Sequence, residues 1–403
     1  IVDRPEPAEA LRANTVWATG LDDAELTLDS QAIVRAAQGR AFESTALHTG
    51  RPGSFIVGAT IDLAPSEERR WHVVADAAHT HSDVAALRAL LASGPDLMQQ
   101  DDASIRRSSE ALRNIVATAD GFQATGSPTT DAHHVANTLF NVMRGGTFLD
   151  GYEIASHRFR TFVRERNAAV ATRHAEWLDE LVDPVRVDDL RTRAAESGDP
   201  DLVRLAHEYL PLAFSRRHGD PSRPWNRFAI RIRDDAGDAI LSYQGNWRDI
   251  FQNWEALSRS FPSFLPSMIA KFLNASTADG FNPYRITNDG IDWEVIEPDN
   301  PWSGIGYWGD HQIVYLDRLL RAQHAHDPSW LESNLGVAAS SFADVPYRDE
   351  PIEHLLRNPK STVEYDVAAE ADVAKRVHAN GADGRSVADQ AGNHVHVTHL
   401  ENL

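Results

Sequence analysis

The sequence contains no cysteine, which excludes disulfide bonds, thiolate nucleophiles and every metal or cluster site built on cysteine ligands. No apolar run approaches the roughly 18 residues that a membrane-spanning helix needs. No G-x-G-x-x-G or Walker sequence occurs, so nothing predicts a dinucleotide or P-loop site. Cations are in the minority, since 39 lysines and arginines face 59 acids and give a formal charge of −20 at pH 7. Duplex nucleic acid and anionic membranes would repel such a surface, and we expect neither as a partner.

The front of the chain predicts β-structure followed by a helical linker. Residues 54–61 and 70–75 are rich in strand-forming side chains and lie between turn signals. Residues 84–119 instead carry apolar side chains at spacings of three and four, which is typical of helices. We therefore expect residues 1–92 to be the C-terminal part of a β-sandwich and residues 93–130 a helical linker. Residues 1–10 carry acid and proline and show no signal-peptide pattern, which favours a cytoplasmic protein.

The rest of the chain predicts a helical body. A capping sequence from Gly126 precedes a long helical region at residues 133–209, with breaks at Gly145-Gly146 and Pro184. A β-hairpin is expected at residues 227–243. Further helices are expected at residues 248–259, 262–275, 310–322 and 368–377. A TIM barrel or a Rossmann sheet would need strands and helices to alternate throughout, and the pattern excludes both.

Six of the ten tryptophans lie between residues 225 and 308: Trp225, Trp247, Trp254, Trp293, Trp302 and Trp308. They fall among loops rich in glycine, proline, asparagine and charged residues, at residues 215–226, 243–249, 278–285, 290–294 and 304–312. Aromatic faces beside carboxylates, amides and arginines are what a sugar-binding cleft requires. The alternative is an aromatic core. We expect the five loops to converge on one end of a helical bundle.

Three motifs in these loops give the sequence a family resemblance. They are Trp247-Arg248-Asp249 at a helix start, the turn Asp279-Gly280-Phe281-Asn282-Pro283, and Trp308-Gly309-Asp310 at another helix start. In this order they resemble the six-hairpin glycosidase superfamily, most closely its cellobiose phosphorylase and glycogen debranching enzyme branches. The resemblance implies a mainly α protein with an N-terminal β segment: a β-sandwich, a helical linker and a complete or truncated (α/α)6 toroid over residues 131–403.

The resemblance also implies an activity. It favours cleavage of a glycosidic bond in a glucan-type oligosaccharide with inversion, by hydrolysis or by phosphorolysis. No metal or organic cofactor is implied, and inorganic phosphate is the co-substrate in the phosphorolytic case. The Trp-Asn-Asp type motif that carries the general acid in the phosphorylase branch does not follow Asp310. Two alternatives therefore stay open: a fragment without the acid, and a non-catalytic carbohydrate-binding protein.

The candidate site residues follow from these loops. The candidate catalytic carboxylates are Asp249, Asp292, Glu294 and Asp310. Asp292 and Glu294 would point to the same side of an extended segment, as pairs that split their pKa values do. The candidate substrate-binding residues are Arg216, Arg217, His218, Trp225, Trp247, Arg248, Asn282, Arg285, Trp293, Trp308 and His311. The first three would suit phosphate, because guanidinium groups bind phosphate bidentately.

Each candidate also has a structural interpretation. An aspartate in a first helical turn stabilises the helix without any catalytic role, which applies to Asp249 and Asp310. Arginines of the first loop can pair with Asp220. Of the histidines, His394, His396 and His399 have the most plausible metal-ligand spacing, but no carboxylate set or H-E-x-x-H sequence completes a site, and we expect no metal.

Overall fold

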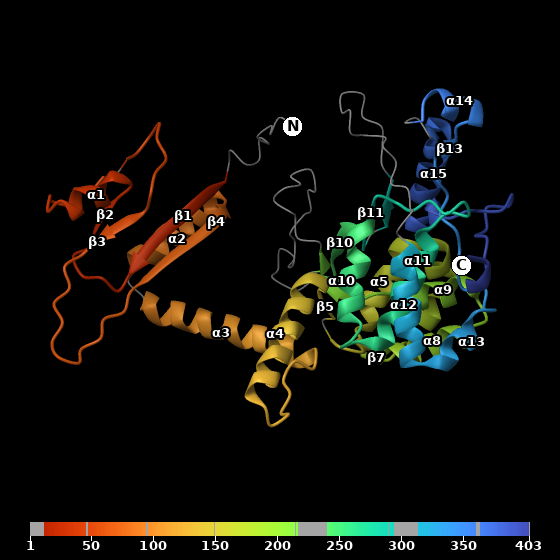
Figure 1. Ribbon diagram of the computed structural model, residues 1–403, viewed down its shortest axis with the longest axis horizontal. Coiled ribbons are helices and arrows are strands. Elements are labelled where there is room, and N and C mark those ends of the chain that lie inside the picture. Colours follow the sequence, from red (N-terminus) through yellow and green to blue (C-terminus); the bar gives the residue numbers. More distant parts are fainter. Residues whose placement is uncertain are drawn as a thin grey trace. The chain divides into compact units, whose positions relative to one another are not determined.

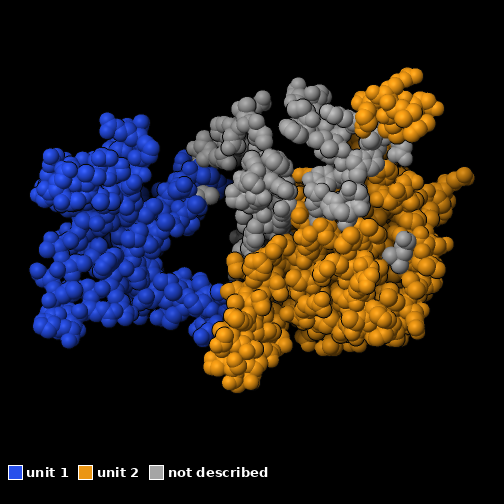
Figure 2. Space-filling view, viewed as in Figure 1, with its two compact units in different colours: residues 1–113 blue, residues 114–403 orange. Residues whose placement is uncertain are grey.

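The computed structural model describes residues 12–45, 47–93, 96–148, 150–213, 215–216, 240–288, 290–293, 313–359 and 363–402. The chain divides into two compact units, Ile1–Arg113 and Asn114–Leu403 (Figure 2). No helix in the described ranges is long and apolar enough to cross a membrane. The division falls inside one long helix, and it does not test the three-domain assignment, which stays a prediction.

The first unit is built on two small antiparallel sheets (Figure 1). Its elements are β1 (Ala13–Thr19), β2 (Glu25–Thr27), α1 (Gln31–Ala37), β3 (Ile56–Gly58), β4 (His72–His79), α2 (His81–Ser93) and the start of α3 (Leu97–Thr118). Strand β1 pairs with β4, and β2 pairs with β3. The predicted strands and the helical residues 84–119 correspond to β3, β4, α2 and α3.

The sheet of β1 and β4 exposes apolar side chains on one face. Val16 lies opposite Ala75, and Ala18 lies opposite Val73, so these four side chains share a face. Val16 and Val73 are both exposed. An apolar sheet face is typical of one layer of a sandwich. The β-sandwich itself stays a prediction.

The second unit is mainly helical, as the sequence predicts. Its helices are α4 (Pro128–Gly145), α5 (Ser156–Arg166), α6 (Ala168–Arg173), α7 (Ala175–Asp179), α8 (Val187–Glu196), α9 (Pro200–Glu208), α10 (Trp247–Leu257), η2 (Pro262–Phe264), α11 (Leu265–Ala275), α12 (Ile313–His326), α13 (Pro328–Asn334), α14 (Ile352–Arg357), α15 (Val367–Asn380), η3 (Ala382–Arg385) and α16 (His399–Asn402). Its strands are β5 (Thr147–Phe148), β6 (Glu153–Ile154), β7 (Val185–Arg186), β8 (Leu212–Ala213), β9 (Ser215–Arg216), β10 (Tyr243–Asn246), β11 (Arg285–Thr287), β12 (Ile291–Asp292), β13 (Tyr347–Asp349) and β14 (Val363–Tyr365). The (α/α)6 toroid stays a prediction.

Local chemistry explains where several helices start. The Ser127 hydroxyl accepts a hydrogen bond from the Thr130 amide and caps α4, and Pro128 fits the first turn. Asp199 caps α9 through the amides of Asp201 and Leu202. The predicted breaks at Gly145-Gly146 and Pro184 are present, because α4 ends at Gly145 and Pro184 immediately precedes β7. Most of the predicted hairpin at residues 227–243 lies outside the described residues.

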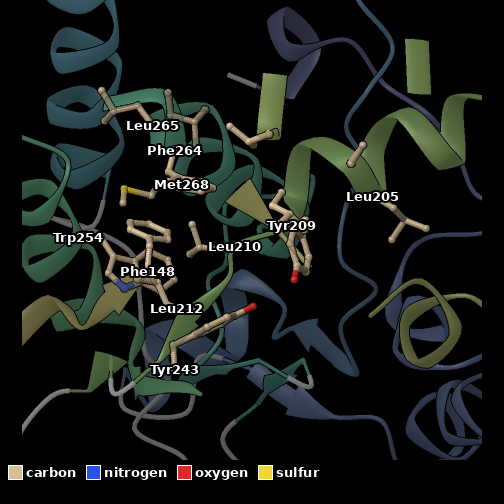
Figure 3. Packing of buried hydrophobic residues seen from close by; sticks show 14 of the residues in the cluster. Phe148, Leu205, Tyr209, Leu210, Leu212, Tyr243, Trp254, Phe264, Leu265 and Met268 are labelled. Carbon is tan, nitrogen blue, oxygen red and sulfur yellow. The ribbon is translucent and has the colours of Figure 1, made fainter. Parts of the chain in front are cut away.

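The core of the second unit surrounds α11, which is buried along nearly its whole length. The Phe148 ring stacks on Phe264 with centroids 3.9 Å apart, and Trp254 contacts Tyr243 edge-on at 5.5 Å. Figure 3 shows these four rings together with Met268 of α11. Helix α11 is therefore the central helix of this core.

Residues 148–212 form a segment whose two ends meet. Strand β5 pairs with β8, so that Phe148 lies opposite Leu212 and Thr147 lies opposite Ala213. The chain leaves the body at β5, forms α5 to α9, and returns to the same place at β8. Adjacent ends are what allow a segment to be inserted into a fold without disturbing the rest.

Candidate functional site

Four short strands from distant parts of the sequence form one sheet, in the order β12-β11-β10-β9. Strand β9 belongs to the predicted loop 215–226, β10 to loop 243–249, and β12 to loop 290–294. The fourth, β11, starts at Arg285, where loop 278–285 ends. The structure thus brings four of the five predicted loops together in this sheet (Figure 1). The fifth, residues 304–312, lies outside the described residues.

The sheet has a polar face and an apolar face. Asn246, Arg285 and Asp292 lie opposite one another across β10, β11 and β12, and Gln244 lies opposite Thr287. We call these five residues the polar face, because residues in register or two apart along a strand share a side. Gly245, Ile286 and Ile291 occupy the opposite face. Ile286 is buried there against the core.

Asp292 and Arg285 form an ion pair on the polar face. The Arg285 Nε donates to Asp292 Oδ2 at 2.6 Å, and its terminal nitrogen contacts the same oxygen. The Asp292 side chain is 45% exposed, so its carboxylate is accessible to a ligand. A pair this exposed adds little stability, typically below about 1 kcal/mol. The ion pair instead holds the Asp292 carboxylate in one orientation.

Asp249 lies in the first turn of α10, directly after β10. The helix starts where the Trp247 amide donates to the Tyr284 carbonyl at 3.0 Å, which fixes the helix start to the residue before β11. Asp249 is half-buried. A carboxylate in this turn is favoured by the helix dipole, so its position fits both the catalytic and the structural interpretation.

The described tryptophans of the cluster are core residues. Trp247 and Trp254 are both 0% exposed, and Trp293 is 8% exposed. The Trp247 ring packs between Phe251 and Phe272, at 4.7 and 4.9 Å. No indole face of Trp247 is left for a sugar, so its placement gives no support to the predicted substrate contact. Trp293 packs edge-on against Tyr347 at 5.9 Å.

Asn282 is buried and stabilises the turn after α11. Its side-chain nitrogen donates to Ser276 Oγ at 2.9 Å and to the Phe281 carbonyl at 3.2 Å. Gly280 adopts a φ of 84°, which favours glycine, and its amide donates to the Thr277 carbonyl. These contacts give the motif a structural role, with the Asn282 amide group turned to the protein.

Several predicted residues lie outside the described part of the chain. They are Glu294, Asp310, Arg217, His218, Trp225, Trp308 and His311. Arg216 is placed in β9 opposite Gln244, and Arg248 in the first turn of α10, but neither side chain is described. The roles of these residues stay predictions.

Sequence reasoning missed a cluster of buried charges. We call it the ion cluster: Arg166, Arg204, Glu208, Lys271 and Asp383. Glu208 is 1% exposed, accepts from Lys271 Nζ at 2.7 Å and Arg204 at 3.1 Å, and also contacts Arg166. Arg204 and Arg166 contact Asp383 as well. The cluster joins α5 and α9 to α11 and to η3 near the C-terminus.

The charges of the cluster keep Glu208 ionised. Burial raises the pKa of Glu208, but the positive charges of Arg166, Lys271 and Arg204 outweigh burial, so the pKa lies well below its usual range. Both carboxylate oxygens accept hydrogen bonds, Oε1 from Lys271 and Oε2 from Arg204 and Asn274. A carboxylate held this way cannot donate a proton at neutral pH. Glu208 is therefore not a candidate general acid.

The C-terminal histidines contact a carboxylate. Asp201 Oδ1 lies 2.9 Å from His394 Nδ1 and 3.2 Å from His396 Nε2, whereas His399 Nδ1 lies 3.2 Å from Ser340 Oγ. Burial raises the pKa of Asp201, but the hydrogen bonds from His394 and His396 outweigh it, and the pKa is lowered. Within the described ranges, no three histidine, aspartate or glutamate side chains gather as a metal site would require.

The half-buried His207 makes stability depend on pH. Burial lowers the pKa of His207 from 6.5 to about 3, with a further contribution from Arg191 and His399. Between pH 6.5 and about 3, His207 is therefore protonated in the unfolded chain and neutral in the folded chain. The free energy of unfolding falls as the pH drops below 6.5. His399, whose pKa burial also lowers, acts in the same direction. We expect His207 to cost up to about 1.4 kcal/mol per pH unit below pH 6.5, and His399 to add to this loss.

Chemical denaturation at pH 7, 6 and 5 would measure this dependence. The His207→Gln variant should lose less stability over the same range, by about 1.4 kcal/mol per pH unit. The carboxylates with lowered pKa values, such as Glu208, contribute only nearer to pH 4.5 and below. An unchanged pH dependence in the variant would show that His207 titrates normally in the folded protein.

One part of the chain is similar to a known protein family. Residues 148–211 match the family described as Glycoside hydrolase family 149 insertion domain 1. The match covers about a sixth of the chain and coincides with the segment whose ends meet at β5 and β8. It contains Arg166, Arg204 and Glu208 of the ion cluster. No curated protein matches the chain. The similarity of residues 148–211 to this insertion domain supports a carbohydrate-active enzyme of the glycoside hydrolase type, with a carbohydrate as its substrate.

Proposed function

We propose that this chain acts in an enzyme that cleaves a glycosidic bond of a glucan-type oligosaccharide with inversion, by hydrolysis or by phosphorolysis. The observation that carries the proposal is the match of residues 148–211 to a glycoside hydrolase insertion domain. The resemblance of the three loop motifs adds the six-hairpin superfamily, its phosphorylase and debranching branches, the β-sandwich and the (α/α)6 toroid. The mechanism requires no metal or organic cofactor.

The polar face suits the chemistry of this reaction. An inverting enzyme needs a protonated carboxyl group beside the leaving oxygen and a second group on the opposite side of the sugar. In hydrolysis the second group is a carboxylate that activates water, and in phosphorolysis the nucleophile is phosphate itself. Asp292 on β12 offers an exposed, oriented carboxylate, and Asp249 follows β10, two strands away in the same sheet. We assign Asp292 the role of the general base or of a group that binds sugar hydroxyls, because its carboxylate already accepts a hydrogen bond from Arg285.

A second candidate function is carbohydrate binding without catalysis. The ion pair between Arg285 and Asp292 favours it, because such a pair binds sugar hydroxyl groups through donor and acceptor together. The burial of Trp247 and Trp254 leaves the described part of the site with fewer stacking surfaces than a catalytic cleft usually has.

Incubation of the chain with glucan oligosaccharides, with and without phosphate, separates these functions. We expect cleavage with an inverted anomeric configuration, which NMR of the first product detects. A rate that depends on phosphate, with release of a sugar phosphate, supports phosphorolysis, and a rate independent of phosphate supports hydrolysis. Binding without cleavage would favour the non-catalytic alternative. Absence of both binding and cleavage would contradict the proposal.

A further inference from the structure

A small pocket lies where four parts of the second unit meet. Its volume is about 30 Å³, and its described lining consists of Arg166, Glu208, Lys271, Asn274, Ala275, Ile286, Thr287, Gly290, Ile291, Ala343, Ala382, Arg385 and Ser386. These residues come from the matched insertion segment, α11, the turn between β11 and β12, and the C-terminal region. The volume admits about two water molecules, so a pyranose ring does not fit inside.

The charges at the pocket favour an anion. Among its described lining residues, Arg166, Lys271 and Arg385 are cations and Glu208 is the anion. Glu208 is already engaged through both oxygens. Arg385 lies 3.6 Å from Glu370, which is an ion pair longer than a hydrogen bond. Arg166 also contacts Asp383, so the cation with the weakest partner is Arg385, whose side chain is 27% exposed. A bound anion would add a partner for Arg385 beside the buried Lys271.

We propose that this pocket binds a small oxyanion, a phosphate or a carboxylate, either free or carried by a sugar. Arg385 at the rim supplies a planar donor group that suits two oxygens of such a group. Lys271, 3% exposed, supplies a buried positive charge, and Thr287 and Ser386 also line the pocket. A sugar attached to the anion would remain outside the pocket. The inference goes beyond the proposed function, since it assigns a binding site whatever reaction the chain performs.

Calorimetric titration of the full chain tests the proposal. The probes are inorganic phosphate, glucuronate as a sugar carrying a carboxylate, and glucose as the neutral control. We expect phosphate to bind and glucose not to bind at this site. Binding of glucuronate more tightly than phosphate would indicate that the natural oxyanion is carried by a sugar, and the reverse order would indicate a free anion.

Two variants locate the binding. Arg385→Gln should weaken phosphate binding by about tenfold or more, because a charge-assisted hydrogen bond is lost. Arg348→Gln is the matched control: Arg348 is 72% exposed, pairs with Asp366 and does not line the pocket. Circular dichroism confirms that each variant is folded.

Three results would overturn the proposal: no binding of either oxyanion, displacement of bound phosphate by glucose, or equal phosphate affinities in Arg385→Gln and the wild type. Absence of phosphate binding would also count against the phosphorolytic form of the proposed function but would leave hydrolytic cleavage untouched. Failure of the cleavage experiment likewise leaves the oxyanion pocket untouched.

Discussion

Replacing Glu208 with glutamine is expected to lower the free energy of unfolding by about 3–5 kcal/mol. The side chain keeps its shape but loses its charge, so Arg166 and Arg204 keep only Asp383 as an anionic partner in the ion cluster, and Lys271 loses its ion pair with Glu208. Uncompensated buried charges are costly because water no longer solvates them. Denaturant unfolding followed by tryptophan fluorescence would measure the loss.

A matched control separates burial from ion pairing as such. Glu255 pairs with Arg318 at 2.6 and 2.7 Å, but Arg318 is largely exposed. Glu255→Gln should therefore cost about 1 kcal/mol or less. In a third variant, Lys271→Met added to Glu208→Gln removes one cation and should recover part of the lost stability. Equal losses for Glu208→Gln and Glu255→Gln would contradict the assignment of Glu208 to a buried cluster.

Local patterns predict much of the helical structure. The cap at Ser127, the breaks at Gly146 and Pro184, and the helices near residues 248–259 and 262–275 all depend on neighbouring residues, and the structure contains them. The pairing of β9 to β12 is different. Its strands have two to four residues each. Strands β9, β10 and β11 pair with partners distant in sequence, so no local pattern sets their register, whereas β11 and β12 form a local hairpin. The convergence of the loops could be expected, but the alignment of Asn246 with Arg285 could not.

The tryptophan cluster shows how a pattern can be misread. Trp247, Phe251 and Trp254 are spaced by four and three residues, which is the spacing of one buried helix face. Their proximity to polar loops favoured a sugar-binding interpretation, but the helical periodicity predicts the core position that the structure shows.

The ion cluster had one signal in the sequence. Lys271 is the charged residue of the otherwise apolar helix α11, and a lysine surrounded by buried positions requires a buried partner. The identity of that partner could not be predicted, because Glu208 lies 63 residues away along the chain and reaches Lys271 only in the folded protein.

Replacing Asp292 or Asp249 with asparagine is expected to lower kcat by about 10²–10⁴-fold if the residue acts in proton transfer. Stability should change little for Asp292→Asn, because its ion pair with Arg285 is partly exposed. Asp317→Asn is the matched control, since Asp317 of α12 also pairs with an arginine, Arg321, and lies outside the polar sheet. It should leave kcat unchanged.

A substrate with an activated leaving group then separates the two roles. A leaving group that departs without protonation restores the rate when the missing carboxyl is the general acid, but not when it is the base. We expect no rescue for Asp292→Asn, because Arg285 orients its carboxylate as an acceptor. Rescue of Asp292→Asn would reverse this assignment. If Asp292→Asn and Asp249→Asn both keep the wild-type rate, neither carboxylate acts in proton transfer, and the acid and base must be sought among other carboxylates.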